Sequence, residues 1–232
     1  MTEEARRARA RLLIVSIAAT AVLHHIPGGR LLALPLMWVS TYVHELGHGL
    51  AAIAVGGAFQ QFVMFPDGSG MAYTAVGEGR LARAVVSAGG LCGPALAAAA
   101  LFALARWRRG TLAALWTLAG LHLLVVLFWV RNAFGLVFVG SLSMLLASIA
   151  RRGTPETARF ALVFFAVQLA LSVFSRSDYL FTRLAETGAG SAPSDVARMA
   201  EALFLPYWFW GGLCGAVSVA VLAAGAWSYL RE

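Results

Sequence analysis

Seven long apolar runs, separated by short segments that carry arginines, are the feature that most limits how this chain can fold. A helix needs about 20 apolar residues to cross a lipid bilayer. The runs cover residues 12–23, 31–57, 84–105, 111–130, 133–150, 160–175 and 203–230. Most of them approach or exceed that length, so they predict membrane-spanning helices. The last run begins with Tyr207-Trp208-Phe209-Trp210 and ends with Trp227 and Tyr229, as expected for aromatic belts at both interfaces.

The composition supports the same interpretation. Of the 232 residues, 60% are hydrophobic and 12% are charged, against about half and about a quarter in soluble domains. Two cysteines are too few for a disulfide-stapled secreted module. The net charge of +7 comes from arginines between the apolar runs, which indicates topology signals and lipid-headgroup contacts rather than nucleic-acid binding. We therefore predict an all-α polytopic membrane protein with about 6–7 transmembrane helices, forming a single domain over residues 1–232.

Two polar stretches interrupt the apolar pattern. In residues 58–76, two β-prone segments flank Pro66-Asp67-Gly68, which predicts a small β-hairpin after the second apolar run. Residues 176–203 form the longest polar connection. There Ser194 is the expected N-cap of a short helix over residues 196–203.

The pentapeptide GGLCG occurs twice, at 89–93 and 211–215. Each copy places glycines four residues apart within an apolar run, a spacing that lets helices pack closely. We interpret both copies as packing glycines, with a remnant of duplication as the alternative.

The run 31–57 contains an H-E-x-x-H sequence formed by His44, Glu45 and His48. On a helix the two histidines lie about 40° apart around the axis and about 6 Å apart along it, so both imidazoles can bind one metal ion. Glu45 can reach a water on that metal without being a ligand. Ionisable residues deep in a bilayer cost roughly 2.5–3.5 kcal/mol each on insertion scales, a cost that a bound cation would offset. We therefore predict a zinc site in which His44 and His48 are ligands and Glu45 is catalytic.

Catalytic zinc usually has a third protein ligand. Asp178, just after the run 160–175, is the first candidate for this ligand. Its alternative role is that of a carboxylate at a helix end, near Arg176 and Arg183. Asp195 is the alternative candidate; otherwise it is a first-turn carboxylate favoured by the helix dipole. His122 is more simply hydrogen-bonded within the helix bundle. Asn132 is a helix cap or a donor that faces the substrate.

HELGHGLAAIAVGG at 44–57 resembles the site-2 protease family of intramembrane zinc metallopeptidases, and more closely its small M50B-like branch. Further matching pieces are FPDGSG (65–70), AGGLCGPAL (88–96), VRNAFG (130–135) and PSDVARMAEALFLPYWFW (193–210). The resemblance implies that His44 and His48 bind zinc and that Glu45 is the catalytic base. It also implies a third ligand within Asn-Pro…Leu-Asp-Gly, a motif this sequence lacks. Asp178 is the nearest positional match, whereas Asp195 belongs to the matching Ser-Asp-Val piece.

The function expected from these features is an intramembrane zinc metalloprotease that hydrolyses peptide bonds in or near transmembrane segments. Its partners would be a membrane-protein substrate and the lipid bilayer, and it would not bind nucleic acid. It would be located in the bacterial cytoplasmic membrane. The hairpin could bind an extended substrate at its edge. The alternatives are an inactive relative with a structural or partner-binding role, which the missing motif favours, and a transporter. The resemblance implies an active site toward the cytoplasm and seven spans, whereas the arginine distribution favours six.

Overall fold

The structure, a computed structural model, describes residues 3–25, 29–107, 110–175, 177–188 and 190–231. Its elements follow the chain in this order: α1 (Glu3–His25), α2 (Gly29–Ala54), β1 (Ala58–Met64), β2 (Gly70–Ala75), α3 (Arg80–Ala105), α4 (Thr111–Phe128), α5 (Ala133–Arg152), α6 (Pro155–Ser175), the 3-10 helix η2 (Ser177–Phe181), β3 (Leu184–Thr187), β4 (Gly190–Pro193), α7 (Asp195–Leu203) and α8 (Tyr207–Arg231).

The predicted class of fold is confirmed, since helices dominate and the strands form only two small sheets. Within the described part of the chain, five helical stretches are long and apolar enough to cross a membrane. They are α3, α4, α5, the stretch Pro155–Phe181 and α8. Each corresponds to an apolar run in the sequence. That α1 and α2 also cross the membrane stays a prediction.

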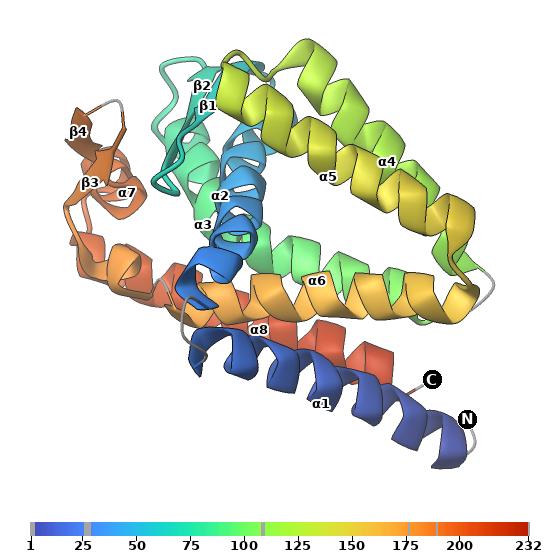
Figure 1. The fold of residues 1–232 in the computed structure, drawn as a ribbon. Coiled ribbons are helices and arrows are strands. Elements are labelled where there is room, and N and C mark those ends of the chain that lie inside the picture. The colour runs from blue at the N-terminus through green and yellow to red at the C-terminus, as the bar shows by residue number, and fades with distance from the viewer. Residues whose placement is uncertain (1–2, 26–28, 108–109, 176, 189, 232) are drawn as a thin grey trace.

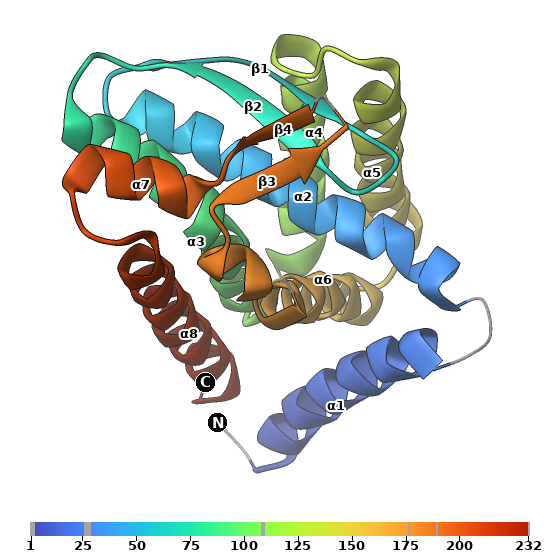
Figure 2. The same cartoon turned by 90° about the vertical axis from the view of Figure 1, so that its left-hand side faces the viewer.

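Most of the long helices extend between two ends of the molecule. Helix α6 packs against α1 and α3, and α3 also packs against α8, while α4 pairs with α5 (Figure 1). Helix α2 has a different direction and lies across α6 at a steep angle, as Figures 1 and 2 show from two sides. The H-E-x-x-H sequence therefore lies on a helix that runs across the bundle rather than along it.

Small residues let α2 and α3 approach each other closely. A Cβ atom built on Gly47 would lie 2.3 Å from the carbonyl oxygen of Gly89, and one built on Gly89 would lie 2.4 Å from the Cβ of Ala51. The two GGLCG segments also meet, because the Sγ of Cys92 lies 3.9 Å from the carbonyl oxygen of Cys214. The close α2–α3 contact supports the interpretation of the first copy as packing glycines.

The predicted hairpin is confirmed as β1 and β2, which pair antiparallel with Val63 opposite Met71. In the connecting turn, the Asp67 carboxylate accepts hydrogen bonds from both the backbone N–H and the hydroxyl of Ser69, at 2.8 and 2.7 Å. These bonds lower the pKa of Asp67. Gly68 has a φ of +89°, a conformation that the turn requires and that glycine adopts without strain.

Residues 129–132 extend this hairpin by pairing with β1. The N–H of Phe62 donates to the Trp129 carbonyl at 2.9 Å, and the N–H of Arg131 donates to the Phe62 carbonyl at 3.2 Å. The Asn132 side chain continues the pairing, since its amide both donates to the carbonyl and accepts from the N–H of Met64, at 2.6 and 3.2 Å. Asn132 is the N-cap residue of α5, as one of our two expectations had it, but its side chain makes no capping hydrogen bond and binds Met64 of the strand instead.

The polar connection 176–203 holds more structure than we predicted. The short helix is confirmed as α7, and the hydroxyl of Ser194 caps it by accepting from the N–H of Ala197 at 3.2 Å. A second hairpin, β3 and β4, precedes it and was not predicted. Its tip touches the first hairpin, because the N–H of Gly188 donates to the hydroxyl of Ser69 at 2.9 Å.

Candidate metal and catalytic site

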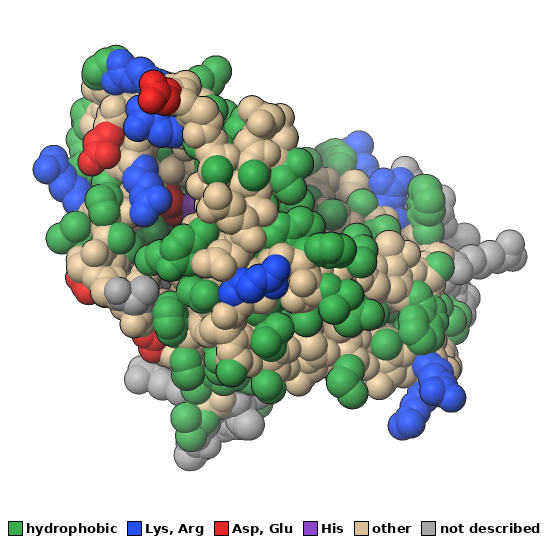
Figure 3. Space-filling model, turned by 90° about the horizontal axis from the view of Figure 1, so that it is seen from above, with side chains coloured by type: hydrophobic (Ala, Val, Ile, Leu, Met, Phe, Trp, Pro, Cys, Tyr) green, Lys and Arg blue, Asp and Glu red, His purple; other side chains and the backbone are tan. Residues whose placement is uncertain are grey.

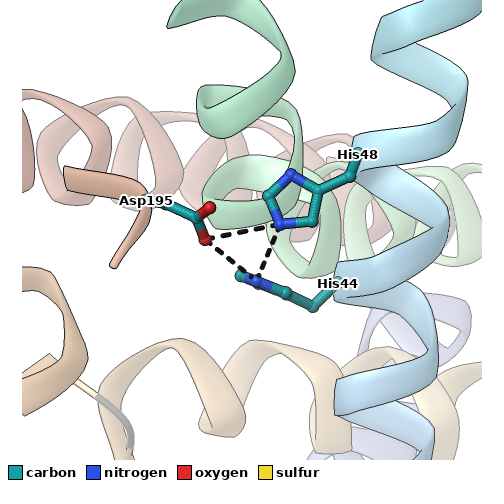
Figure 4. A group of neighbouring side chains, drawn as sticks. All are labelled: His44, His48 and Asp195. Atoms are coloured by element: carbon teal, nitrogen blue, oxygen red, sulfur yellow. Dashed lines mark hydrogen bonds and ion pairs between the residues drawn. The ribbon is translucent and has the colours of Figure 1, made fainter. Parts of the chain in front are cut away.

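Helix α2 presents His44 and His48 on one face, one turn apart, as the sequence predicts. Their Nε2 atoms lie 3.1 Å from each other. Asp195, the first residue of α7, approaches from the opposite side (Figure 4). Its Oδ2 atom lies 3.1 Å from the His44 Nε2 and 3.4 Å from the His48 Nε2. Three atoms that can bind a metal thus converge from helices far apart in the sequence.

Asp195 reaches this position because Ser194 fixes the start of α7. The Ser194 hydroxyl donates to the carbonyl of Thr182 at 2.6 Å, and the Ser194 N–H donates to the carbonyl of Arg183 at 2.9 Å. These bonds tie α7 to the segment after η2. Asp195 consequently lies in the first turn of α7, where the helix dipole favours a negative charge. Its carboxylate is also a partner of the two imidazoles.

The three distances fit a metal-binding geometry. Ligand nitrogen and oxygen atoms about 2.05 Å from a tetrahedral zinc ion lie about 3.3 Å from one another. The observed separations of 3.1, 3.1 and 3.4 Å are close to that value. All three side chains are largely buried, with exposed fractions of 19% for His44, 12% for His48 and 8% for Asp195. Two imidazole nitrogens and one carboxylate oxygen are a donor set that suits zinc.

A backbone carbonyl orients one of the two imidazoles. The His48 Nδ1 lies 2.8 Å from the carbonyl oxygen of Val86 on α3. A carbonyl can only accept, so this nitrogen carries the proton, and in the neutral ring the Nε2 has its lone pair free toward Asp195. Such a hydrogen bond is the usual partner of a metal-binding histidine.

The carboxylate of Asp195 is held in its ionised form. Burial alone would raise the pKa of Asp195, but the positive charge of the protonated His48 ring and the hydrogen bonds donated by the protonated His44 and His48 rings outweigh it and lower the pKa well below its usual range. The hydroxyl of Tyr179 also donates to the same Oδ2 atom at 3.3 Å. An ionised carboxylate is the form that binds a metal ion.

Glu45 points into the same region and is 5% exposed. It lines two adjoining pockets, of about 100 and 80 Å³, together with His44. Gly70, the first residue of β2, lies against it, because a Cβ atom there would be 2.9 Å from the Glu45 Cγ and 3.1 Å from its Oε1. A buried carboxylate beside the His–His–Asp group is placed to exchange protons with a bound water.

The two pockets form a cleft between the hairpins, which we call the site cleft. On one side it is lined by the start of β2 and on the other by β3 and β4, with the histidines at its base. The β-strand residues that line its smaller pocket are Gly70, Met71, Ala72, Thr74, Ala185, Thr187, Ala192 and Pro193.

The structure distinguishes among the candidates named from the sequence. It brings His44, His48 and Asp195 together, with Glu45 nearby. The backbone of Asp178 lies in η2, but its side chain lies outside the described residues. His122 is elsewhere: its Nδ1 lies 2.6 Å from the carbonyl oxygen of Leu118 on the same helix.

Three contributors to the site were not anticipated from the sequence: the Val86 carbonyl, Gly90 and Tyr179. Gly90 lies in the repeated GGLCG segment, which signalled close packing but not contact with a histidine. Tyr179 follows the last residues of an apolar run, where aromatic residues are common for other reasons. A backbone carbonyl leaves no signal in a sequence.

This fold and this site define a class of protein: a polytopic integral membrane protein with a buried His–His–Asp group that could hold a metal ion. The model of the Peptidase M50B-like family matches residues 12–225, and the chain therefore belongs to that family. The resemblance noted from the H-E-x-x-H region is thus confirmed. No curated protein and no solved structure matches the chain.

Proposed function

We propose that this protein is an intramembrane zinc metalloprotease that cleaves peptide bonds in or near membrane-spanning segments of other proteins. The observation that carries the proposal is the convergence of His44 Nε2, His48 Nε2 and Asp195 Oδ2 at separations of 3.1–3.4 Å. The ligands proposed are therefore His44, His48 and Asp195, in place of the set that included Asp178.

The chemistry follows from the donor set and from Glu45. When bound, zinc would acidify a water molecule and polarise the scissile carbonyl group. Glu45 would accept a proton from the attacking water and deliver it to the leaving amine. Glu45 and Asp195 are buried, which limits the contact of bulk water with the reacting groups.

The free edge of β2 is a binding surface for an extended substrate. Phe62 directs its N–H and carbonyl away from β2, toward residues 129–131. In an antiparallel pair, the residue opposite such a position also directs its backbone groups outward. That residue is Ala72, which lines the site cleft. A substrate strand that pairs with Ala72 would be unwound from its helix and held over the site.

The decisive experiment compares Glu45→Gln with Glu78→Gln, which changes an exposed glutamate in the loop after β2. Each variant is co-expressed with a single-span reporter protein, purified in detergent and assayed for zinc. We expect Glu45→Gln to abolish cleavage and keep the zinc, and Glu78→Gln to keep both. Cleavage by Glu45→Gln would contradict the mechanism. If the wild type holds zinc but cleaves no membrane substrate, the protein is a non-enzymatic relative. If it carries zinc across the membrane of proteoliposomes, it is a transporter.

A further inference from the structure

The two GGLCG segments bring their cysteines together in the fold. Cys92 belongs to α3 and Cys214 to α8. The Sγ of Cys92 lies 3.9 Å from the carbonyl oxygen of Cys214, and the two thiols form a hydrogen bond with each other. Both are free thiols. A single cysteine between helices is most simply a small packing residue, whereas two thiols in contact can react with each other.

Close packing of α3 on α8 favours a bond between the two cysteines. A Cβ atom built on Gly225 of α8 would lie 2.7 Å from the Cα of Ala99 of α3. The backbones of the two helices therefore nearly touch further along from the cysteines. A disulfide joins residues whose Cα atoms are about 4.4–6.8 Å apart, a separation that only closely packed helices reach.

The two thiols differ in their surroundings. Cys92 is half-buried, and the Ser218 hydroxyl, one turn after Cys214 on α8, is hydrogen-bonded to it. Cys214 is buried, and its Sγ lies 4.0 Å from the Sδ of Met199 on α7. A small oxidant would therefore reach Cys92 before Cys214.

The site cleft leads to this pair of thiols. Its larger pocket, of about 100 Å³, extends from His44 and Glu45 to Leu91, the neighbour of Cys92, and to Ser218. A histidine side chain is visible from outside the molecule in Figure 3, as expected if the cleft opens to its surroundings. A pocket of this volume admits molecules of about the size of water, and hydrogen peroxide is such a molecule.

We propose that Cys92 and Cys214 are a redox pair that hydrogen peroxide converts to a disulfide, and that this bond weakens metal binding at the neighbouring site. In the first step the Cys92 sulfur attacks one peroxide oxygen and the O–O bond breaks. Cys92 becomes a sulfenic acid, and the other oxygen leaves as water with the proton of the thiol. In the second step the Cys214 sulfur attacks the sulfenic sulfur, the S–S bond forms, and the sulfenic oxygen leaves as water with the proton of Cys214. The two thiols lose two electrons, which reduce one peroxide molecule to two water molecules.

Both cysteines adjoin elements that hold the His–His–Asp group. Met199, which contacts the second cysteine, lies one turn after Asp195 on α7. Gly90, two residues before Cys92 on α3, lies against the ring of His48. An S–S bond is about 2.05 Å long, so its formation draws the two cysteines together and shifts the segments packed against them. This second step rests on the metal site of the proposed function, whereas formation of the disulfide does not.

The first experiment counts free thiols in the full chain, purified in detergent with a phosphine reductant that is then removed. After treatment with hydrogen peroxide, the protein is denatured and its remaining thiols are labelled with N-ethylmaleimide. We expect both thiols to be lost from a chain that stays monomeric on a non-reducing gel, and the reductant to restore both. Thiols that stay free, a dimer joined by cysteines, or a loss that the reductant does not reverse would overturn the proposal.

Single substitutions test the order of the two steps. Cys214→Ser leaves Cys92 without a partner thiol, so we expect its sulfenic acid to persist and to be trapped by dimedone. Cys92→Ser leaves only the buried thiol and should give no adduct. An adduct on Cys214 but none on Cys92 would overturn the assignment of Cys92 as the attacked thiol.

A second measurement compares the zinc affinity of the oxidised and the reduced chain by competition with a chelator. We expect the oxidised chain to bind zinc about tenfold more weakly, the lower end of the effect of groups that orient a metal ligand, and the reductant to restore the affinity. Cys92→Ser, treated with peroxide in the same way, is the control and should keep its affinity. Equal affinity of the oxidised and reduced chains would overturn the coupling. A reduced chain that holds no zinc would instead contradict the proposed function.

Discussion

Gly90 of α3 lies directly against the imidazole ring of His48, with no space for a side chain between them. A Cβ atom at residue 90 would lie 2.2 Å from the His48 Cε1 and 2.3 Å from its Nε2. The ring cannot simply move away, because its Nδ1 is bonded to the Val86 carbonyl on the same helix at 2.8 Å. One helix therefore both holds and confines a proposed metal ligand.

We predict that Gly90→Ala lowers zinc affinity by about 10–100-fold, the range seen when groups that orient a metal ligand are lost. The added methyl group would displace the Nε2 atom from the position that faces His44 and Asp195. The measurement is competition with a chelator of known affinity in detergent solution. Gly212→Ala is the matched control, because it changes the second glycine of the other GGLCG copy, where a Cβ atom has nothing within 4 Å. Equal zinc loss in both variants would show that the contact with His48 is not the cause.

Substitution of each candidate aspartate in turn shows which of the two is the third zinc ligand. Asp195→Asn replaces the ionised carboxylate beside both imidazoles with a neutral amide, a poor zinc ligand. We expect it to lose zinc while the purified protein keeps its elution volume in size-exclusion chromatography. Asp178→Asn should keep its zinc. If Asp178→Asn lost the metal and Asp195→Asn kept it, the assignment would be reversed.

The features that the sequence predicted correctly are those governed by local patterns. Apolar runs of sufficient length became helices, the Pro66-Asp67-Gly68 turn became a hairpin, and Ser194 became an N-cap. The placement of His44 and His48 on one face also follows from helix geometry alone. Each of these depends on residues only a few positions apart.

What could not be predicted depends on contacts between distant segments. Asp195 and the histidines are about 150 residues apart in the chain, and no local rule distinguishes Asp195 from Asp178. The close packing of α2 on α3, across the bundle, likewise joins residues far apart in the sequence. The second hairpin lies in a stretch of small residues with weak β propensity, so its pairing left little signal.

Asn132 offers a test of how the first hairpin is held. Its side chain makes two hydrogen bonds to the backbone of Met64, a residue that is fully buried. Asn132→Ala would leave a buried donor and acceptor without partners, which costs about 1–3 kcal/mol. We expect a lower midpoint in denaturation by sodium dodecyl sulfate. Gln60→Ala, an exposed change in the same strand, should leave the midpoint unchanged, and equal midpoints for all three chains would contradict the role given to Asn132.

The edge of β2 can be blocked at one backbone group without breaking the hairpin. Because Ala72 directs its N–H away from β1, Ala72→Pro removes no bond of the hairpin ladder, and proline is tolerated at the edge of a sheet. It removes the donor that a substrate strand would use. We expect cleavage of the membrane reporter to fall by about five- to tenfold, the value of roughly one hydrogen bond, with zinc content unchanged. Ala72→Val keeps the N–H and should cleave normally. A proline variant with full activity would show that the substrate does not pair with β2, whereas a valine variant as slow as the proline variant would point to the shape of the site cleft instead.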